Sequence, residues 1–147
     1  MDIVREKLIL APPAVIFDCV VNAELIPQWM DNVESIRYTS DIDPLQPVGT
    51  TFSQRVREGI FPREYSGEVV EYRAYDAFGV RFGDRRFRFQ LNYSLTEVAG
   101  GTRVVYRLRS VRESAFMALA GRMVRGMAAG MADQHIRGLK NFAESRS

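Results

Sequence analysis

The stretch Phe87-Arg88-Phe89-Gln90-Leu91-Asn92-Tyr93-Ser94-Leu95 alternates between apolar and polar side chains. Side chains on a β-strand point to opposite faces in turn, so this alternation predicts a strand with one buried and one solvated face. Residues 102–109 show the same alternation, and the Gly100-Gly101 pair between the two segments suits a hairpin turn. The two strands are therefore expected to pair.

Outward from this hairpin, the rest of the chain predicts five more strands and two short helices. Proline, glycine and aspartate separate the further strands, which are expected over residues 3–10, 33–39, 50–58, 65–72 and 78–82. Residues 13–21 follow a Pro-Pro pair and carry one charge, Asp18, which predicts a short buried helix. Residues 24–30, anchored by Trp29, predict a second helix.

The last segment, residues 110–145, predicts one long amphipathic helix. It contains no proline, and its apolar residues recur at helical spacing. Ser110 and Glu113 have the form of a capping box, and Ser114 is an alternative start. The recurring positions are Phe116, Leu119, Ala120, Met123, Met127, Met131, His135, Leu139 and Phe142.

This order of elements predicts an α+β helix-grip fold. A seven-stranded antiparallel sheet would wrap around the long C-terminal helix, with the two short helices between strands 1 and 2. The chain has 147 residues, of which 46% are hydrophobic and 11% aromatic. That length and composition suit a single domain over residues 1–147 with a sizeable core.

Composition also excludes several classes of protein. The chain has no uncharged apolar run long enough to span a membrane and no signal-peptide pattern, so we expect a cytoplasmic location. One cysteine and one histidine build neither a disulfide nor a typical zinc site. No nucleophile elbow or nucleotide-binding loop is present, so we expect no hydrolase triad, no metal and no cofactor.

The formal net charge of +2 hides a basic block. Residues 81–112 hold eight basic and two acidic side chains. Five arginines of this block have outward strand parity among polar rather than aromatic neighbours: Arg86, Arg88, Arg103, Arg107 and Arg109. Nucleic-acid platforms need stacking rings on such a face, so the block predicts a solvated surface and no nucleic-acid partner.

Four segments carry a family resemblance that extends over essentially the whole chain. They are Ala11-Pro12-Pro13-Ala14-Val15-Ile16-Phe17-Asp18, Leu25-Ile26-Pro27-Gln28-Trp29, Val48-Gly49-Thr50-Thr51-Phe52 and Gly100-Gly101-Thr102-Arg103-Val104. Together they resemble the polyketide cyclase/dehydrase branch of the START-like (SRPBCC) superfamily. The resemblance implies a hydrophobic small molecule enclosed between sheet and helix, and in some members an aromatisation or cyclisation there.

The residues themselves also indicate a cavity. Met123, Met127 and Met131 form a stripe of flexible side chains near several helix glycines, and we expect this stripe to face the sheet. The alternative is ordinary core packing. Strand parity and these positions give the following candidate ligand-binding residues: Trp29, Phe52, Gln54, Phe78, Val80, Phe82, Phe89, Leu91, Tyr93, Tyr106, Met123, Met127 and Met131.

Three residues are candidates for proton transfer. Tyr93 and Tyr106 need hydrogen-bond partners if buried, although either hydroxyl can instead reach solvent at a strand end. His135 is a possible general acid or base, or a partly exposed residue near a helix end.

The sequence favours a carrier, sensor or accessory protein, monomeric or homodimeric, for an aromatic, polyketide-like or lipid-like molecule. The alternative is a polyketide cyclase, aromatase or dehydratase.

Overall fold

The computed structural model describes residues 1–147 except 59, 86, 113–114 and 116–118. Its strands are β1 (Asp2–Ile9), β2 (Val33–Tyr38), β3 (Thr51–Glu58), β4 (Phe61–Arg73), β5 (Ala77–Gly83), β6 (Arg88–Val98) and β7 (Gly101–Arg112). Its helices include α1 (Pro13–Val21), α2 (Ile26–Trp29) and α4 (Gly121–Arg146). Of the sequence predictions, Arg86, Glu113, Ser114 and Phe116 lie outside the described residues.

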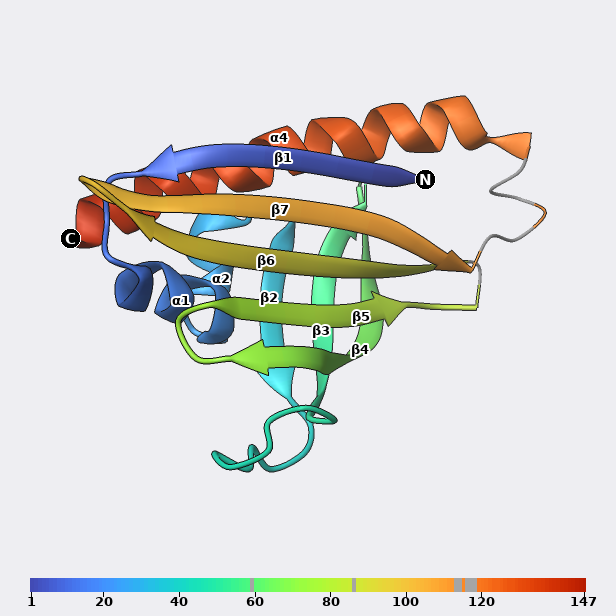
Figure 1. Ribbon diagram of the computed structural model, residues 1–147. Helices are drawn as coiled ribbons and strands as arrows, with labels where there is room; N and C mark the ends of the chain where they lie inside the picture. The colour runs from blue at the N-terminus through green and yellow to red at the C-terminus, as the bar shows by residue number, and fades with distance from the viewer. Residues whose placement is uncertain (59, 86, 113–114, 116–118) are drawn as a thin grey trace.

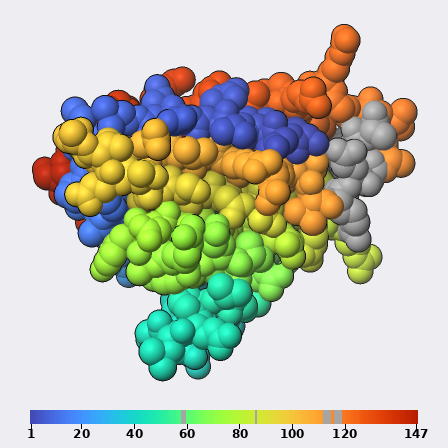
Figure 2. All heavy atoms as spheres, viewed as in Figure 1, coloured from blue at the N-terminus to red at the C-terminus, as the bar shows by residue number. Residues whose placement is uncertain are grey.

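The seven strands form one antiparallel sheet in the order β1-β7-β6-β5-β4-β3-β2. Figure 1 shows a curved sheet in which β2 and β3 run across the direction of β5, β6 and β7. The long helix α4 lies along β1, and α1 and α2 lie near its C-terminal half. Figure 2 shows the loop between β2 and β3 standing out from the body. This arrangement confirms the predicted helix-grip fold.

The β6–β7 hairpin supplies the centre of the core, as its alternation predicts. Leu91 pairs with Leu108, and Tyr93 pairs with Tyr106. All four side chains are buried. Their polar neighbours, such as Asn92 on β6, lie on the other face of the sheet. The hydrophobic effect therefore fixes the register, because a shift of one residue would expose this face.

The helix α4 begins later than predicted. Ser110 lies in β7, so the Ser110–Glu113 capping box does not start a helix. Its cross-strand neighbour is Phe89, and the backbone N–H of Ser110 donates to the carbonyl of Met1. Tertiary pairing with β6 and the N-terminus thus overrides the local capping signal.

The expectation that the methionine stripe faces the sheet is wrong for Met123 and Met127. Their side chains are 72% and 64% exposed, and Met131 is half-buried. Each step of four residues turns the side-chain direction by about 40° beyond a full turn. Residues spaced four apart therefore drift around the helix: His135 and Leu139 lie on its buried face, whereas Met127 and Met123, earlier in the same row, lie outside that face. The buried row of α4 consists of Ala128, Ala132, His135, Ile136, Leu139 and Ala143.

Gly138 is the point where α4 meets α2. A Cβ atom at this position would collide with the backbone carbonyl of Trp29, whereas one at Gly126 would meet open space. The missing side chain therefore allows the two helices to approach closely. Gly130, like Gly126, faces open space, so neither glycine is required by a close contact within the described residues.

Alanine substitutions at the two glycines should have opposite effects. Gly138→Ala should lower the free energy of unfolding by roughly 1 to 3 kcal/mol, because α2 must shift away from α4. Gly126→Ala should raise it by up to about 1 kcal/mol, because alanine is the better helix former. Thermal denaturation of both variants measures this. Equal melting temperatures would contradict the close contact at Gly138.

Candidate functional site

A row of aromatic side chains lies buried beneath the C-terminal half of α4. Tyr93 and Tyr106 face each other across β6 and β7, with ring centroids 5.5 Å apart in an edge-to-face arrangement. Trp29 of α2 meets Tyr93 edge-on at 6.5 Å. Its indole N–H donates to the carbonyl of Cys19 over 2.9 Å. The sheet and α2 therefore position these three rings, which the sequence predicted as ligand-binding residues.

His135 of α4 extends this row through hydrogen bonds on both ring nitrogens. Its Nε2 lies 2.7 Å from the side-chain oxygen of Asn32, and its Nδ1 lies 3.1 Å from the hydroxyl of Tyr106. An amide oxygen only accepts, so Nε2 carries the ring proton and Nδ1 accepts from Tyr106. Both partners of His135 therefore fit the neutral imidazole.

Burial keeps this group neutral. His135 is 4% exposed, and burial lowers its pKa to about 4, against a smaller opposing effect from Asp31. Burial also raises the pKa of Tyr106. The pair holds its protons at neutral pH and so acts as a hydrogen-bonding unit. The expectation of a partly exposed histidine near the helix end is wrong.

The hydroxyl of Tyr93 differs from that of Tyr106. It is buried, and no described residue offers it a hydrogen-bond partner. Burial, and less strongly the nearby Tyr106, raise the pKa of Tyr93 well above its usual value. A buried polar group left without a partner costs about 1 to 3 kcal/mol. The geometry therefore presents one neutral hydroxyl, able to donate or accept, inside an apolar surrounding.

The remaining predicted site residues fall into separate groups. The rings of Phe82 and Phe89 lie 6.0 Å apart in a tilted arrangement, and Phe87 adjoins Phe89, toward the start of β6. Phe78 packs on Phe17 and Tyr72, away from that group. The other members of the predicted set on β3, β5 and β6 vary in burial: Phe52 and Leu91 are buried, and Gln54 and Val80 are half-buried.

Two residues of this region were missed by the sequence reasoning. Phe87 has the same strand parity as Phe89, so alternation alone could have added it to the predicted set. Asn32 lies in the turn between α2 and β2 and is 103 residues from His135. No local pattern signals such a pairing, because it depends on how α4 crosses the sheet.

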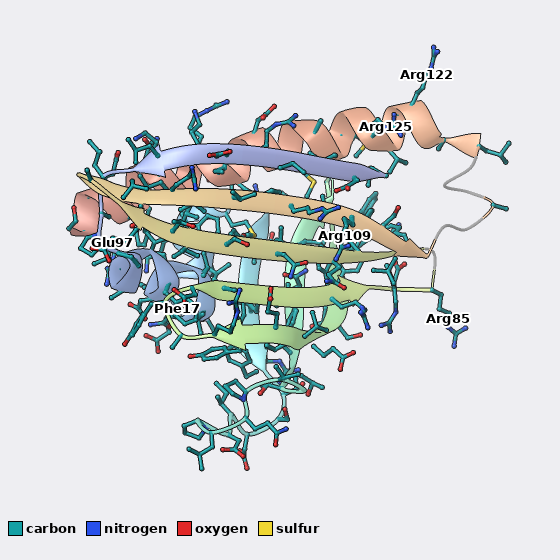
Figure 3. All side chains as sticks on the ribbon, in the orientation of Figure 1. Phe17, Arg85, Glu97, Arg109, Arg122 and Arg125 are labelled. Carbon is teal, nitrogen blue, oxygen red and sulfur yellow. The ribbon has the colours of Figure 1, made fainter. Side chains whose placement is uncertain are left out.

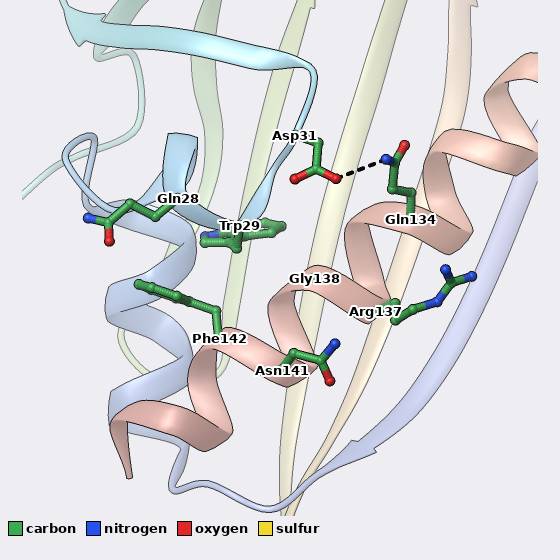
Figure 4. Close-up of a pocket in the computed structure, with 8 residues that line it drawn as sticks. All are labelled: Gln28, Trp29, Asp31, Gln134, Arg137, Gly138, Asn141 and Phe142. Atoms are coloured by element: carbon green, nitrogen blue, oxygen red, sulfur yellow. Dashed lines mark hydrogen bonds between the residues drawn. The ribbon is translucent and has the colours of Figure 1, made fainter.

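A cleft lies on the surface between α2 and α4 (Figure 4). This cleft of about 460 Å³ opens to solvent, and Gln134 donates to the carboxylate of Asp31 across it over 3.0 Å. Of the predicted ligand-binding residues, Trp29 lines it. Its full lining is Gln28, Trp29, Asp31, Gln134, Arg137, Gly138, Asn141 and Phe142.

The described residues hold neither a metal site nor a membrane span. No group of three or more histidine, cysteine, aspartate or glutamate side chains among them is arranged to hold a metal ion. None of the helices in that part of the chain combines the length and apolar character needed to cross a bilayer.

A curved antiparallel sheet that encloses buried aromatic rings under a long C-terminal helix defines a helix-grip protein of the START-like class. The chain belongs to the family described as polyketide cyclase/dehydrase and lipid transport, whose model matches residues 1–144. A search of curated protein sequences finds no match.

Solved structures share the fold at low sequence identity. TTHA0849 from Thermus thermophilus is 17% identical with a TM-score of 0.80, over 100% of this chain and 99% of its own. MLL2253 from Mesorhizobium loti is 17% identical with a TM-score of 0.75, over 100% of this chain and 98% of its own. The di-domain ARO/CYC StfQ of the steffimycin biosynthetic pathway is 14% identical with a TM-score of 0.78, over 99% of this chain and 51% of its own.

Acidification should destabilise the protein through His135. The pKa of the imidazole is near 6.5 in the unfolded chain, whereas burial lowers it to about 4 in the folded protein. In this window the unfolded state binds more protons, so the free energy of unfolding falls as the pH falls, by roughly 3 kcal/mol over the whole window.

Urea denaturation of wild type and His135→Gln at several pH values measures this contribution. The variant should be less stable at pH 7 and should lose this part of the pH dependence. Because the sequence has one histidine, its imidazole resonances also report the pKa directly by NMR. A measured pKa near 6.5 would disprove the buried neutral state.

Proposed function

We propose that this chain binds a hydrophobic small molecule between the sheet and α4, as a carrier, sensor or accessory protein. One observation carries the proposal: the buried hydroxyl of Tyr93 finds no partner among the described residues. A ligand oxygen would supply that partner. The expected ligand is therefore apolar, aromatic, polyketide-like or lipid-like, with an oxygen atom that reaches Tyr93. We assign this binding to residues 1–147 as a single domain.

The N-terminal half of α4 supports this assignment. Helical geometry places Met123, Met127 and Met131 on the same flank as Gln134 and Gly138. Those two residues contact Asp31 and Trp29, so this flank faces α2 and β2. Flexible methionine side chains here can adapt to apolar ligands of different shape. In this proposal they form the entrance rather than the floor of the site.

The facing strands offer matching apolar surface. Phe82 and Phe87 are only half-buried, although they adjoin the buried Phe89. Half-buried rings at one end of a core give a ligand apolar contacts without removing the packing around Leu139 and Ile136. The ligand would thus lie between these phenylalanines and the methionine flank, with its oxygen toward Tyr93.

The alternative function is a polyketide cyclase, aromatase or dehydratase in the same place. The family description and the ARO/CYC protein StfQ favour it. Tyr93, Tyr106 and His135 would then transfer protons, a role worth about 10² to 10⁴ in rate. Incubation with aromatic polyketide intermediates tests this role. If turnover persists in the triple variant Tyr93→Phe, Tyr106→Phe, His135→Ala, these three residues do not transfer the protons.

A pair of tyrosine variants tests the role of the Tyr93 hydroxyl. Wild type should bind 2-naphthol about 5 to 10 times more tightly than naphthalene, as expected for one hydrogen bond worth about 1 kcal/mol. Tyr93→Phe should abolish this preference without loss of stability, because its hydroxyl contacts no protein partner. Fluorescence titration gives the affinities, and thermal denaturation gives the stability.

Tyr106→Phe is the matched control. It should lower the melting temperature, because Nδ1 of His135 loses its hydrogen bond, yet it should keep the preference for naphthol. A preference that survives in Tyr93→Phe would remove the hydroxyl from the site. If neither compound binds, and native mass spectrometry of protein purified from its host shows no retained ligand, the binding proposal is wrong.

A further inference from the structure

The end of the molecule where α4 begins exposes a row of large apolar side chains. Leu119 is 91% exposed, Met123 72% and Met127 64%. Figure 1 shows the first turns of α4 projecting beyond the start of β1, so the sheet does not cover them. The C-terminal half of the same helix, by contrast, buries His135, Leu139 and Ala143. The exposed row therefore has no packing role in the described part of the chain.

Arginines accompany this apolar row. Arg122 and Arg125 are exposed on the same turns, and no acidic residue occurs between Gly121 and Ala132. In Figure 3 both side chains extend from the start of α4, and Arg85 extends from the β5–β6 connection at the same end of the molecule. Arg88, at the start of β6, is also exposed.

Arg122 and Arg125 differ from several arginines elsewhere on the surface. Arg5 pairs with Asp133, Arg103 with Glu6, and Arg107 with Asp2. Within the described residues, no acid lies in ion-pairing distance of Arg122 or Arg125. Two arginines of the basic block, Arg103 and Arg107, are thus paired with acids of β1, while Arg122 and Arg125 keep their positive charge uncompensated by an acid of the described residues.

The two kinds of side chain occupy opposite flanks of the helix. Helical geometry puts Met123 on the same side of α4 as Gln134, and Arg122 on the side of Asp133, which pairs with Arg5 of β1. Arg125 lies between Arg122 and the sheet-facing side of the helix. Between the flanks, Gly126 and Gly130 face open space. This outer surface has no bulky side chain, so a flat partner can approach the helix backbone while both flanks reach it. Apolar and basic flanks on one helix are typical of segments that lie at a lipid–water interface.

We propose that this end of the molecule docks on the surface of an anionic lipid bilayer. Arg122 and Arg125 contact headgroup phosphates, with Arg88 adding to the attraction, while Leu119 and Met123 enter the interfacial layer. A nucleic acid is disfavoured because the row is aliphatic and offers no rings for stacking. An acidic protein would also satisfy the arginines, so the test below uses polyglutamate to distinguish such a partner from a bilayer.

Docking depends on the surface alone and not on the proposed ligand site. If the proposed function also holds, the methionine flank that forms the proposed entrance would lie next to the membrane. An apolar ligand would then pass between bilayer and protein with little contact with water.

Vesicle binding tests the proposal. Wild type should sediment with vesicles of equal parts phosphatidylglycerol and phosphatidylcholine, and not with phosphatidylcholine alone. Binding should weaken as salt shortens the Debye length from about 30 Å at 0.01 M to about 8 Å at 0.15 M. The Arg122→Glu, Arg125→Glu variant should bind at least about 20-fold more weakly, since each arginine near an anionic surface contributes about fivefold.

Two further variants make the test specific. Arg73→Glu with Arg137→Glu changes the net charge by the same amount, from +2 to −2, at exposed positions away from the start of α4, and should bind within about threefold of wild type. Leu119→Ser with Met123→Gln keeps the charge and should weaken vesicle binding about tenfold, without changing binding to polyglutamate. Circular dichroism checks that each variant is folded.

Three results would overturn the proposal. The first is an absence of binding to anionic vesicles at low salt. The second is an equal loss in both arginine variants, which would indicate net charge alone. The third is vesicle binding that is insensitive to the Leu119 and Met123 substitutions and matched by polyglutamate, which would indicate an acidic protein partner instead.

Discussion

The two hydrogen bonds of His135 connect three parts of the molecule that are far apart in the sequence. Nδ1 accepts from Tyr106 on β7, and Nε2 donates to Asn32 in the turn between α2 and β2. The bond to Tyr106 is buried and the bond to Asn32 is partly buried, and an unpaired polar group in such surroundings is costly. They therefore fix the rotation of α4 about its own axis. Next to them, Gly138 lets the backbone of α4 approach Trp29 closely.

That rotation divides α4 into two halves with different surroundings. The C-terminal half turns alanines, His135 and Leu139 into the core, whereas the N-terminal half carries exposed methionines and arginines beyond the sheet. A packed half gives stability, and an exposed half is free to contact other molecules. The proposed ligand entrance and the proposed membrane contact both follow from this division, because both use the exposed turns at the start of α4.

Chemically, the buried site is poor in charge. His135 is neutral and satisfied on both sides, and burial raises the pKa values of Tyr93 and Tyr106. Such a site recognises one oxygen of an apolar ligand more readily than it abstracts a proton. The contrast between Tyr106, which has a protein partner, and Tyr93, which has none among the described residues, is the most specific feature of the site.

Much of the fold could be predicted from the sequence, because strand alternation and helix periodicity are local properties of the chain. The β6–β7 hairpin and the burial of Tyr93 and Tyr106 follow from a period of two along residues 87–109. The other strands follow from the proline, glycine and aspartate between them, and the two short helices from their prolines and apolar residues. The first helix even begins and ends as predicted, at Pro13 and Val21. Local pattern thus establishes which residues can share a face of a strand or helix.

Which of those faces is covered depends instead on the packing of distant segments. A row of methionines four residues apart reads as a buried stripe, but α4 turns it outward, because His135 and Gly138 set the rotation of the helix. The partner of His135, the missing partner of Tyr93 and the uncompensated arginines at the start of α4 likewise depend on contacts between distant segments. Local periodicity carries no information about such contacts, since they form only when the sheet curves around the helix.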